Sequence, residues 1–465
     1  MTSWIKKLIW VYLVLLLIEG AFRKWWLPSM ADAFLVVRDP VVLAIYALAF
    51  VSGTFPRNSF MVALGGLAAA SVVASVLAGQ TNPLVVAYGM RINYLHVPLI
   101  WVMGSVLNRK DVERIGTFFL VAGIVMTWVM VKQFNSPMDA SINRGVGAEE
   151  GGQIFGADGR IRPPGLFAFI TGPQLFFPLC AAFFFDQIGG AKRMPWYLLV
   201  ACGLAIAIAL PVSISRYVMI GTGIVAVMFL ITLPLSSSRL ASMGRPLILL
   251  CLLAVALSQL PVFKQGTTVF MMRWDQAAHE SDGQAWGSLI DRTFRAFTNT
   301  VYFVEQAPFF GHGIGVGSNV GSRLLYGTMG FVLAEEEWGK VILELGPILG
   351  FAFILFRTWL SIHLGLEAWR AARHDHNTLP LLIWAALVFA IFQGQWAPPT
   401  VLGFAVIGGG LILGAINPVP VVETEEAAAI AEAASTPLIL AQSTHAALPT
   451  PSDRRPPIVI RSVEK

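Results

Sequence analysis

The sequence predicts an all-helical integral membrane protein with about twelve transmembrane helices. Apolar residue types (Ala, Val, Ile, Leu, Met, Phe, Trp, Tyr and Cys) occupy 56% of the 465 positions, and Asp, Glu, Lys and Arg only 13%, about half their usual share in soluble domains. The mean hydropathy is +0.69, and apolar stretches of roughly 20 residues, the length that crosses a bilayer, recur as far as residue 417. These observations exclude a soluble globular protein and predict one polytopic membrane domain over residues 1–417.

Polar interruptions divide this domain into its predicted spans. The first span follows Lys6 and Lys7 and continues into Glu19 with no small-residue cleavage site, so we expect a retained helix and not a signal peptide. In order, the predicted spans are 5–22, 36–53, 60–78, 84–107, 115–134, 166–185, 196–212, 217–234, 246–261, 338–357, 379–396 and 400–417.

The cysteines and the net charge argue against two classes of function. Cys180, Cys202 and Cys251 lie in apolar stretches without paired spacing, which is typical of buried packing residues and not of a disulfide framework or a metal site. The formal charge of +5 is spread through the connections with no basic run, so we expect no nucleic-acid partner. We predict no metal and no other cofactor.

Basic residues in the short connections predict the orientation, because cytoplasmic connections carry an excess of Lys and Arg. Arg23, Lys24 and Arg38 violate this pattern, and we interpret the violation as a need for an anionic partner at the outer face. Interfacial anchoring beside Trp25 and Trp26 is the alternative for the first two. The residues that place the N-terminus in the cytoplasm are Arg57, Arg109, Lys110, Arg114, Lys192, Arg193, Arg239, Arg245, Arg370 and Arg373.

Two outer connections are too long to be turns. The first, about 135–165, is polar and Gly-rich and ends in Pro163-Pro164-Gly165, which predicts an ordered lid or loop. The second, about 262–337, lies between the ninth and tenth helices, and apolar residues at helical spacing around Arg292 predict a helix lying on the outer surface. The residues after 417 are rich in Ala, Glu and Pro, so 418–465 are predicted to be a disordered cytoplasmic tail.

A glycine run follows the predicted surface helix. In Gly311-His312-Gly313-Ile314-Gly315-Val316-Gly317 every second residue is glycine. Glycine permits positive φ and close backbone approach, as a loop that cradles an anion needs. We expect such a nest here.

Charged residues in or beside the spans are the candidate site residues, because the bilayer makes them costly. They are Arg91 with His96, Arg216 after Ser213-Ile214-Ser215, Arg38 with Asp39, and the triplet Glu335, Glu336 and Glu337. Each has a structural alternative: mutual neutralisation for Arg38 and Asp39, a packed hydrogen-bonded side chain for His96, snorkelling for Arg91, an interfacial anchor for Arg216, and a solvated first helical turn for the triplet.

Cations on several helices that meet one acidic cluster at the outer rim suit a lipid-linked pyrophosphate. Arginines bind a diphosphate through charge-assisted, often bidentate hydrogen bonds, and they stabilise the negative charge that grows on it as a leaving group. A carboxylate beside it would take the proton from an attacking sugar hydroxyl.

The order and spacing of these elements resemble the core of the O-antigen ligase and polymerase superfamily. The resemblance covers about 200–355, and it rests on Ser213-Ile214-Ser215-Arg216, on the glycine run, and on Glu335 through Gly346 followed by Gly350. In the first half, the segments Gly20-Ala21-Phe22-Arg23-Lys24-Trp25, Arg38-Asp39-Pro40, Gly89-Met90-Arg91 with His96 and Pro98, and Arg162-Pro163-Pro164-Gly165 are similar to a subgroup linked to bacterial exopolysaccharide synthesis.

The resemblance implies a metal-independent, inverting glycosyltransferase of C-type architecture in the bacterial inner membrane. Such enzymes transfer a glycan from undecaprenyl pyrophosphate to an acceptor glycan on the periplasmic side, and other polysaccharide assembly proteins are the expected partners. Arg216 matches the family arginine whose implied role is to bind the pyrophosphate. Arg38, Arg91, Arg162 and Arg292 are the further cations that we expect around the substrate.

The sequence departs from the ligases of this family at the start of the tenth helix. A His-Asn-type pair lies nine positions before the Glu of the Glu-x-Gly element in the ligases, and counting back from Glu344 places Glu335 and then Glu336 there. This favours polymerisation, or a ligase-like enzyme with a carboxylate base at Glu335 or Glu336. His312 is the alternative source of a catalytic or substrate-binding imidazole, and capping of the loop backbone is its structural role.

Three other functions remain open from the sequence. A secondary transporter of two halves would usually have its long connection inside, between helices six and seven, where this chain has only a short one. A flippase for lipid-linked glycans would also need cations for the pyrophosphate, but along a central cavity. The third is a structural assembly factor.

Overall fold

Helices make up most of the described structure. The computed structural model describes residues 1–146, 153–189, 194–235, 258–279, 299–327, 330 and 332–418, all within the compact unit Met1–Val419. The described residues contain an isolated antiparallel bridge between Phe155 and Ile161. The predicted all-helical class is confirmed, whereas the tail from 419 lies outside the described residues.

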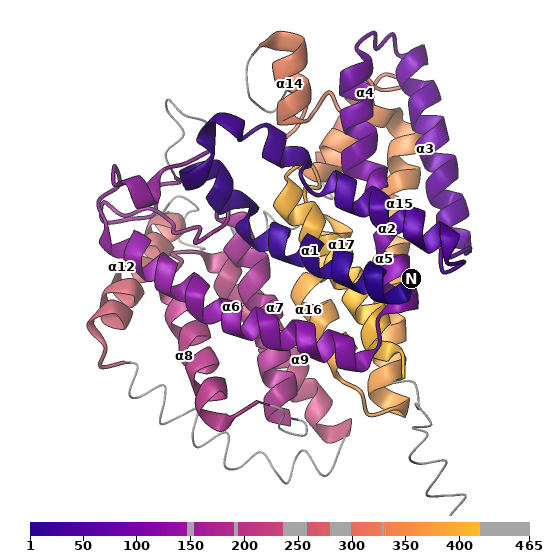
Figure 1. Cartoon of the computed structure of the whole chain (residues 1–465). Helices are drawn as coiled ribbons and strands as arrows, with labels where there is room; N and C mark the ends of the chain where they lie inside the picture. The colour runs from indigo at the N-terminus through magenta and orange to yellow at the C-terminus, as the bar shows by residue number, and fades with distance from the viewer. Residues whose placement is uncertain are drawn as a thin grey trace, which may run out of the picture. The chain divides into compact units, whose positions relative to one another are not determined.

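The helices run along the chain as Figure 1 labels them. Two π-helices, Phe22–Trp26 and Arg91–Leu95, follow α1 and α4. The α-helices are α1 (Thr2–Ala21), α2 (Asp39–Val51), α3 (Ser59–Leu77), α4 (Pro83–Met90), α5 (Leu99–Val106), α6 (Arg109–Asn135), α7 (Thr171–Gly189), α8 (Trp196–Val212), α9 (Arg216–Thr232), α12 (Pro261–His279), α14 (Asn319–Tyr326), α15 (Glu337–His374), α16 (Leu379–Phe392) and α17 (Pro399–Ile416).

Six helical segments of the described chain are long and apolar enough to cross a membrane, and α8 and α16 are shorter apolar helices. The chain is therefore a multi-pass membrane protein, but the twelve predicted spans are not confirmed. Most of predicted span 246–261 lies outside the described residues. The six segments are Ala33–Val51, Ser59–Leu77, Arg109–Asn135, Arg216–Leu235, Glu337–His374 and Pro399–Ile416.

The predicted span 84–107 is wrong as a single helix. The chain forms α4, then the π-helix Arg91–Leu95, and resumes as α5 only at Leu99. Pro98 explains the break, because proline lacks an N–H and disfavours helical geometry in the residue before it. The break places Arg91 and His96 at a junction between two short helices.

The predicted span 338–357 is also wrong, because α15 reverses direction at Gly346. Gly346 has φ 79° and ψ 169°, which glycine adopts readily. Arg357 lies 2.9 Å from Glu337, although 20 residues of straight helix would separate them by about 30 Å. We call Glu337–Leu345 the short arm and Pro347–His374 the long arm of the α15 hairpin.

The helix ends gather at two ends of the described unit. One end, here called the loop end, holds the end of α1, the start of α2, the connecting residues 136–146, 153–170 and 213–215, the start of α15 and the segment 393–398. Contacts at the opposite end are Lys6 with Asp111 (2.6 Å), Ser105 with the Thr54 carbonyl (3.1 Å), Asn377 with the Ala415 carbonyl (2.7 Å) and Asn417 with the Leu107 carbonyl (2.9 Å).

Helix α17 lies in the interior and packs on α5 and α16 (Figure 1). It is the most buried of the six candidate spans, with 83% of its most apolar window inside the structure. A Cβ at Gly409 or Gly410 would meet the side chains of Ile100 or Met103 below 3 Å. These small residues let α5 approach closely, which is typical of helix pairs in membranes.

Candidate functional site

The end of α1 is attached to the connection that precedes α7. The Lys24 ammonium donates to the Gly165 carbonyl at 2.8 Å, and the Gln133 side chain accepts from the Gly165 N–H at 2.8 Å. A Cβ at Gly20 would lie 2.2 Å from the Ala168 nitrogen. Two sequence segments about 140 residues apart therefore meet at the loop end.

Lys24 is fully buried, and it lies outside the predicted spans. Its ammonium stands 4.4 Å from the centroid of the Trp25 ring. Burial lowers its pKa to about 7. The anionic partner expected for Lys24 is replaced by a carbonyl, and the expectation is wrong at this residue.

Glu19 supplies the anionic partner expected for Arg23 and Arg38. Its carboxylate lies 3.2 Å from Arg38 Nε and 3.7 Å from Arg23 Nη1. Arg38 is 1% exposed, and its other two nitrogens donate to the Tyr12 hydroxyl and the Pro399 carbonyl. Arg38 is thereby bound to α1 and to the start of α17, so this conformation leaves its guanidinium little capacity for a substrate.

Asp39 holds Arg91 and His96 together. Its two carboxylate oxygens lie 2.5 Å from Arg91 Nε and 3.0 Å from His96 Nε2, and the other ring nitrogen of His96 lies 3.2 Å from the Tyr12 hydroxyl. Arg91 also donates to the Leu35 carbonyl. Asp39 pairs with Arg91 and His96. His96 is packed and hydrogen-bonded, as its structural alternative states.

Arg91 retains one unused donor. Its Nη1 is buried without a hydrogen-bond partner, while the residue as a whole is 8% exposed. Arg91 and Arg38 differ in this respect, because only Arg91 keeps a terminal nitrogen for a ligand.

Arg216 begins α9 and is half-buried. The preceding Ile214 has φ 47°, and Ser215 accepts a hydrogen bond from Gln174 of α7 at 3.2 Å. A Cβ at Gly156 would lie 2.9 Å from Ile214 Cδ1. The Ser213–Ser215 turn thus presents Arg216 beside the connection that carries Arg162.

Arg162 is half-buried in that connection, and its backbone N–H donates to the Ile154 carbonyl at 2.9 Å. Arg292 and most of the surface helix predicted around it lie outside the described residues, but residues 299–306, which include its last apolar position Val301, are helical. The described part of 262–337 also contains α12, which was not predicted, and α14.

The glycine run has positive φ at Gly311, Gly313 and Gly315, with values of 68°, 97° and 91°. The expectation of a nest for an external anion needs correction, because protein groups use its N–H donors. The Glu344 carboxylate, 1% exposed, accepts from Gly317 N at 2.8 Å, and Ser75 Oγ accepts from Ile314 N at 2.9 Å. Packed against the α15 hairpin, the run holds a carboxyl group of the chain itself.

His312 is exposed, and its backbone N–H donates to the Leu343 carbonyl at 2.8 Å. The loop therefore fixes its main chain and leaves the imidazole at the surface.

The acidic triplet divides into three environments. Glu335 is exposed and precedes the helix, whereas Glu336 is half-buried at the N-cap and accepts from Asn299 at 3.1 Å. Glu337, 4% exposed, is the first residue of α15. The triplet is neither one shared cluster nor one solvated helical turn.

Two buried cations that the sequence analysis did not select bind Glu337. Its carboxylate lies 2.9 Å from Arg357 Nη1 and 2.8 Å from Lys340 Nζ. Arg357, with no exposed surface, lies in the apolar long arm. A charged residue within an apolar stretch indicates a functional site. This criterion, applied to the sequence, would have selected Arg357.

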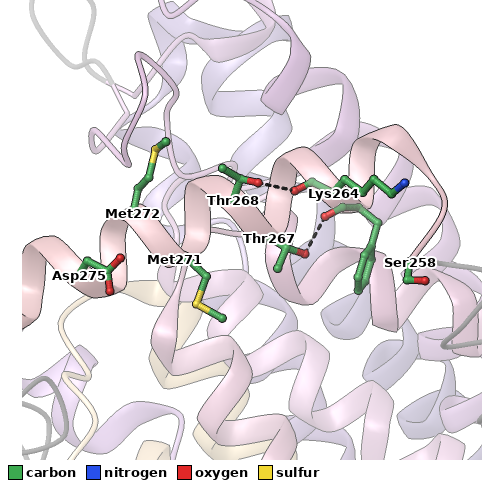
Figure 2. Close-up of a pocket in the computed structure, with 8 residues that line it drawn as sticks. Ser258, Lys264, Thr267, Thr268, Met271, Met272 and Asp275 are labelled. Carbon is green, nitrogen blue, oxygen red and sulfur yellow. Dashed lines mark hydrogen bonds between the residues drawn. The ribbon is translucent and has the colours of Figure 1, made fainter.

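A shallow pocket lies along α12 (Figure 2). All of its lining residues come from Ser258 to Asp275, so it is one face of this segment and not a cavity between helices. Met271 and Met272 are 53% and 44% exposed, and Thr267 and Thr268 bond back to carbonyls of the same helix. Among the described residues, three or more His, Cys, Asp or Glu side chains nowhere gather to hold a metal.

No family model, no curated protein and no solved structure matches the chain.

Proposed function

We propose that this protein is an inner-membrane polysaccharide polymerase or ligase that transfers a glycan from undecaprenyl pyrophosphate to an acceptor glycan on the periplasmic side. The observation that carries the proposal is the meeting of distant segments at the loop end. Arg38, the N-cap residue of α2, touches Glu19 of α1 and Pro399 of α17, and Gly89 packs on Gly315. The segments that carry the resemblance to the O-antigen ligase and polymerase superfamily thus contact one another.

Arg91, Arg162 and Arg216 are the best candidates for the pyrophosphate. Arg216 and Arg162 retain exposed surface, and Arg91 keeps one donor nitrogen. Arg38 instead holds α1, α2 and α17 together, which makes it a structural residue in this proposal. Arginine suits a diphosphate because its planar fork bonds two oxygens at once.

Glu335 or Glu336 would act as the base. Both retain accessible surface, whereas Glu337 is committed to Arg357 and Lys340. The base would take the proton from the acceptor hydroxyl as the pyrophosphate departs and the anomeric centre becomes oxocarbenium-like.

Deletion of the protein in its host, followed by analysis of lipid-linked oligosaccharides, tests the proposal. Accumulated single repeats would identify a polymerase, and accumulated full-length lipid-linked polymer a ligase. Lipid-linked repeats trapped on the inner leaflet would contradict both and identify a flippase. Unchanged lipid-linked glycans would contradict the proposal altogether.

A further inference from the structure

Arg357 lies where the two arms of the α15 hairpin meet the end of α16. The reversal at Gly346 brings Glu337 of the short arm beside Arg357 of the long arm. A Cβ at Gly350 would lie 2.8 Å from Ile342 Cα, so the arms approach closely between the bend and this ion pair. The contact therefore depends on the hairpin and not on helical neighbours.

The guanidinium is bound on three sides. Besides Glu337, it donates to the Ile391 carbonyl at 3.1 Å and to the Gly394 carbonyl at 2.7 Å, and its Cζ lies 3.9 Å from the centroid of the Trp396 ring. The last carbonyls of a helix lack partners within the helix and carry partial negative charge. Arg357 thus caps the C-terminal end of α16 from a neighbouring helix.

The same contacts reach the acidic pair of the proposed site. Glu335 and Glu336 directly precede Glu337, and the Gln395 amide donates to the Glu335 carbonyl. The Trp396 N–H lies 3.5 Å from the Glu337 carboxylate. Arg357, the Gln395 amide and the Trp396 N–H therefore tie residues 335–337 to the segment 393–398.

We propose that Arg357 is a positioning residue that holds the Glu335–Glu336 pair and the segment 393–398 in one fixed arrangement. It touches no substrate, and its role rests on the proposed function of that pair. Lysine cannot replace it, because a single ammonium cannot bond a carboxylate and two carbonyls in different directions while covering an indole ring.

The test compares Arg357→Lys with wild-type protein in lipid vesicles. The donor is lipid-linked oligosaccharide extracted from host cells that lack the protein. Arg357→Lys keeps the charge that Glu337 needs, so we expect a cooperative unfolding transition, an unchanged donor KM and a kcat lower by about 10²-fold, as for a misplaced catalytic group. The matched control is Arg370→Lys, in which the same change is made to an exposed residue of the same arm.

Amide hydrogen exchange provides the second measurement. We expect faster exchange at 335–337 and 393–398 in Arg357→Lys, but not in Arg370→Lys. If Arg357→Lys does not fold, Trp396→Phe replaces it, because that change removes only the indole bond to the Ala390 carbonyl and part of the stacked surface; the same fall in kcat is expected.

The results separate the two proposals. A normal kcat in the folded Arg357 variant, or unchanged exchange at both segments, would overturn the positioning role. A fall in kcat with a matching rise in donor KM would also overturn it, because that pattern indicates substrate contact. If the wild-type protein transfers no glycan, the proposed function fails, and the exchange comparison still decides whether Arg357 fixes the two segments.

Discussion

Burial determines which arginines of this protein remain available to a ligand. Arg38 is 1% exposed and each of its three nitrogens faces Glu19, Tyr12 or Pro399. Arg216 is half-buried at the start of α9. Both were selected from the sequence as substrate ligands. Their environments differ, so we expect Arg38 to be structural and Arg216 to bind the substrate.

Arg216→Ala should abolish glycan transfer without lowering the amount of folded protein. Arg216→Lys should also be poor, because an ammonium cannot reproduce two parallel hydrogen bonds to a diphosphate. Transfer assays in vesicles measure both variants, with Arg370→Lys as the control. A fully active Arg216→Lys protein would assign the residue to interfacial anchoring.

Replacement of the acidic triplet should separate catalysis from stability. Glu337→Gln leaves Arg357 and Lys340 buried without their carboxylate, so it should cost about 3–5 kcal/mol in the free energy of unfolding. Glu335→Gln or Glu336→Gln should leave stability nearly unchanged, and one of them should lower turnover by about 10²–10⁴-fold. Full activity in both would place the base elsewhere.

Lys24 should make stability depend on pH. The folded state holds its pKa near 7, against 10.5 as the ordinary value. Between these values the unfolded chain binds the proton and the folded protein does not, so stability rises with pH, by at most about 1.4 kcal/mol per unit. The apparent Tm of wild-type protein should therefore gain more between pH 7 and pH 9 than that of Lys24→Met. The exposed Lys132→Met is the control, and equal gains in wild type and Lys24→Met would contradict the mechanism.

At the scale of elements, the α15 hairpin organises the loop end. Its bend at Gly346 packs on the start of the glycine run. A Cβ on Gly346 would lie 2.2 Å from the Phe309 carbonyl oxygen and 2.9 Å from the Gly311 nitrogen. The short arm then carries Glu337 to Arg357, and Glu344 to the amide of Gly317. The position of the Glu335–Glu336 pair thus depends on the reversal of the chain at Gly346.

Gly346→Ala should disrupt this element. A non-glycine residue at φ 79° costs about 1–3 kcal/mol, and the clash with Phe309 adds to it. We expect a lower Tm and loss of transfer. The control is Gly223→Ala in α9, where a Cβ meets nothing within 4 Å and alanine favours the helix. Equal stability of the two variants would argue against a strained, close-packed bend.

The sequence predicted the positions of helices that local composition determines. It did not predict contacts that depend on the tertiary structure. Apolar length located α3, α6, α9 and α17 closely. The reversal at Gly346 was missed, although glycine followed by proline is a known helix-ending signal. That Glu19 pairs with Arg38 could not be derived, because Glu19 in α1 and Arg38 at the N-cap of α2 meet only through the fold.

At the scale of the whole molecule, the two ends of the described unit carry different kinds of charged groups. The loop end carries the buried networks around Arg38 and Arg357. The opposite end carries exposed cations on the connections that the basic-residue pattern assigns to the cytoplasm, such as Arg57 and Arg370. If the loop end is periplasmic, the opposite end is cytoplasmic. The exposed cations at that end then agree with the excess of basic residues expected in cytoplasmic connections.

Cysteine labelling should place Asp139 outside and Arg57 inside. Both are exposed, one in the connection after α6 and the other in that between α2 and α3. In a background with all three native cysteines replaced by alanine, Asp139→Cys should react with a membrane-impermeant maleimide once the outer membrane is permeable. Arg57→Cys should react only after the inner membrane is opened. The reverse pattern would place the loop end in the cytoplasm, where a periplasmic acceptor glycan could not reach Glu335 or Arg216, and the proposed transfer reaction would fall with the orientation.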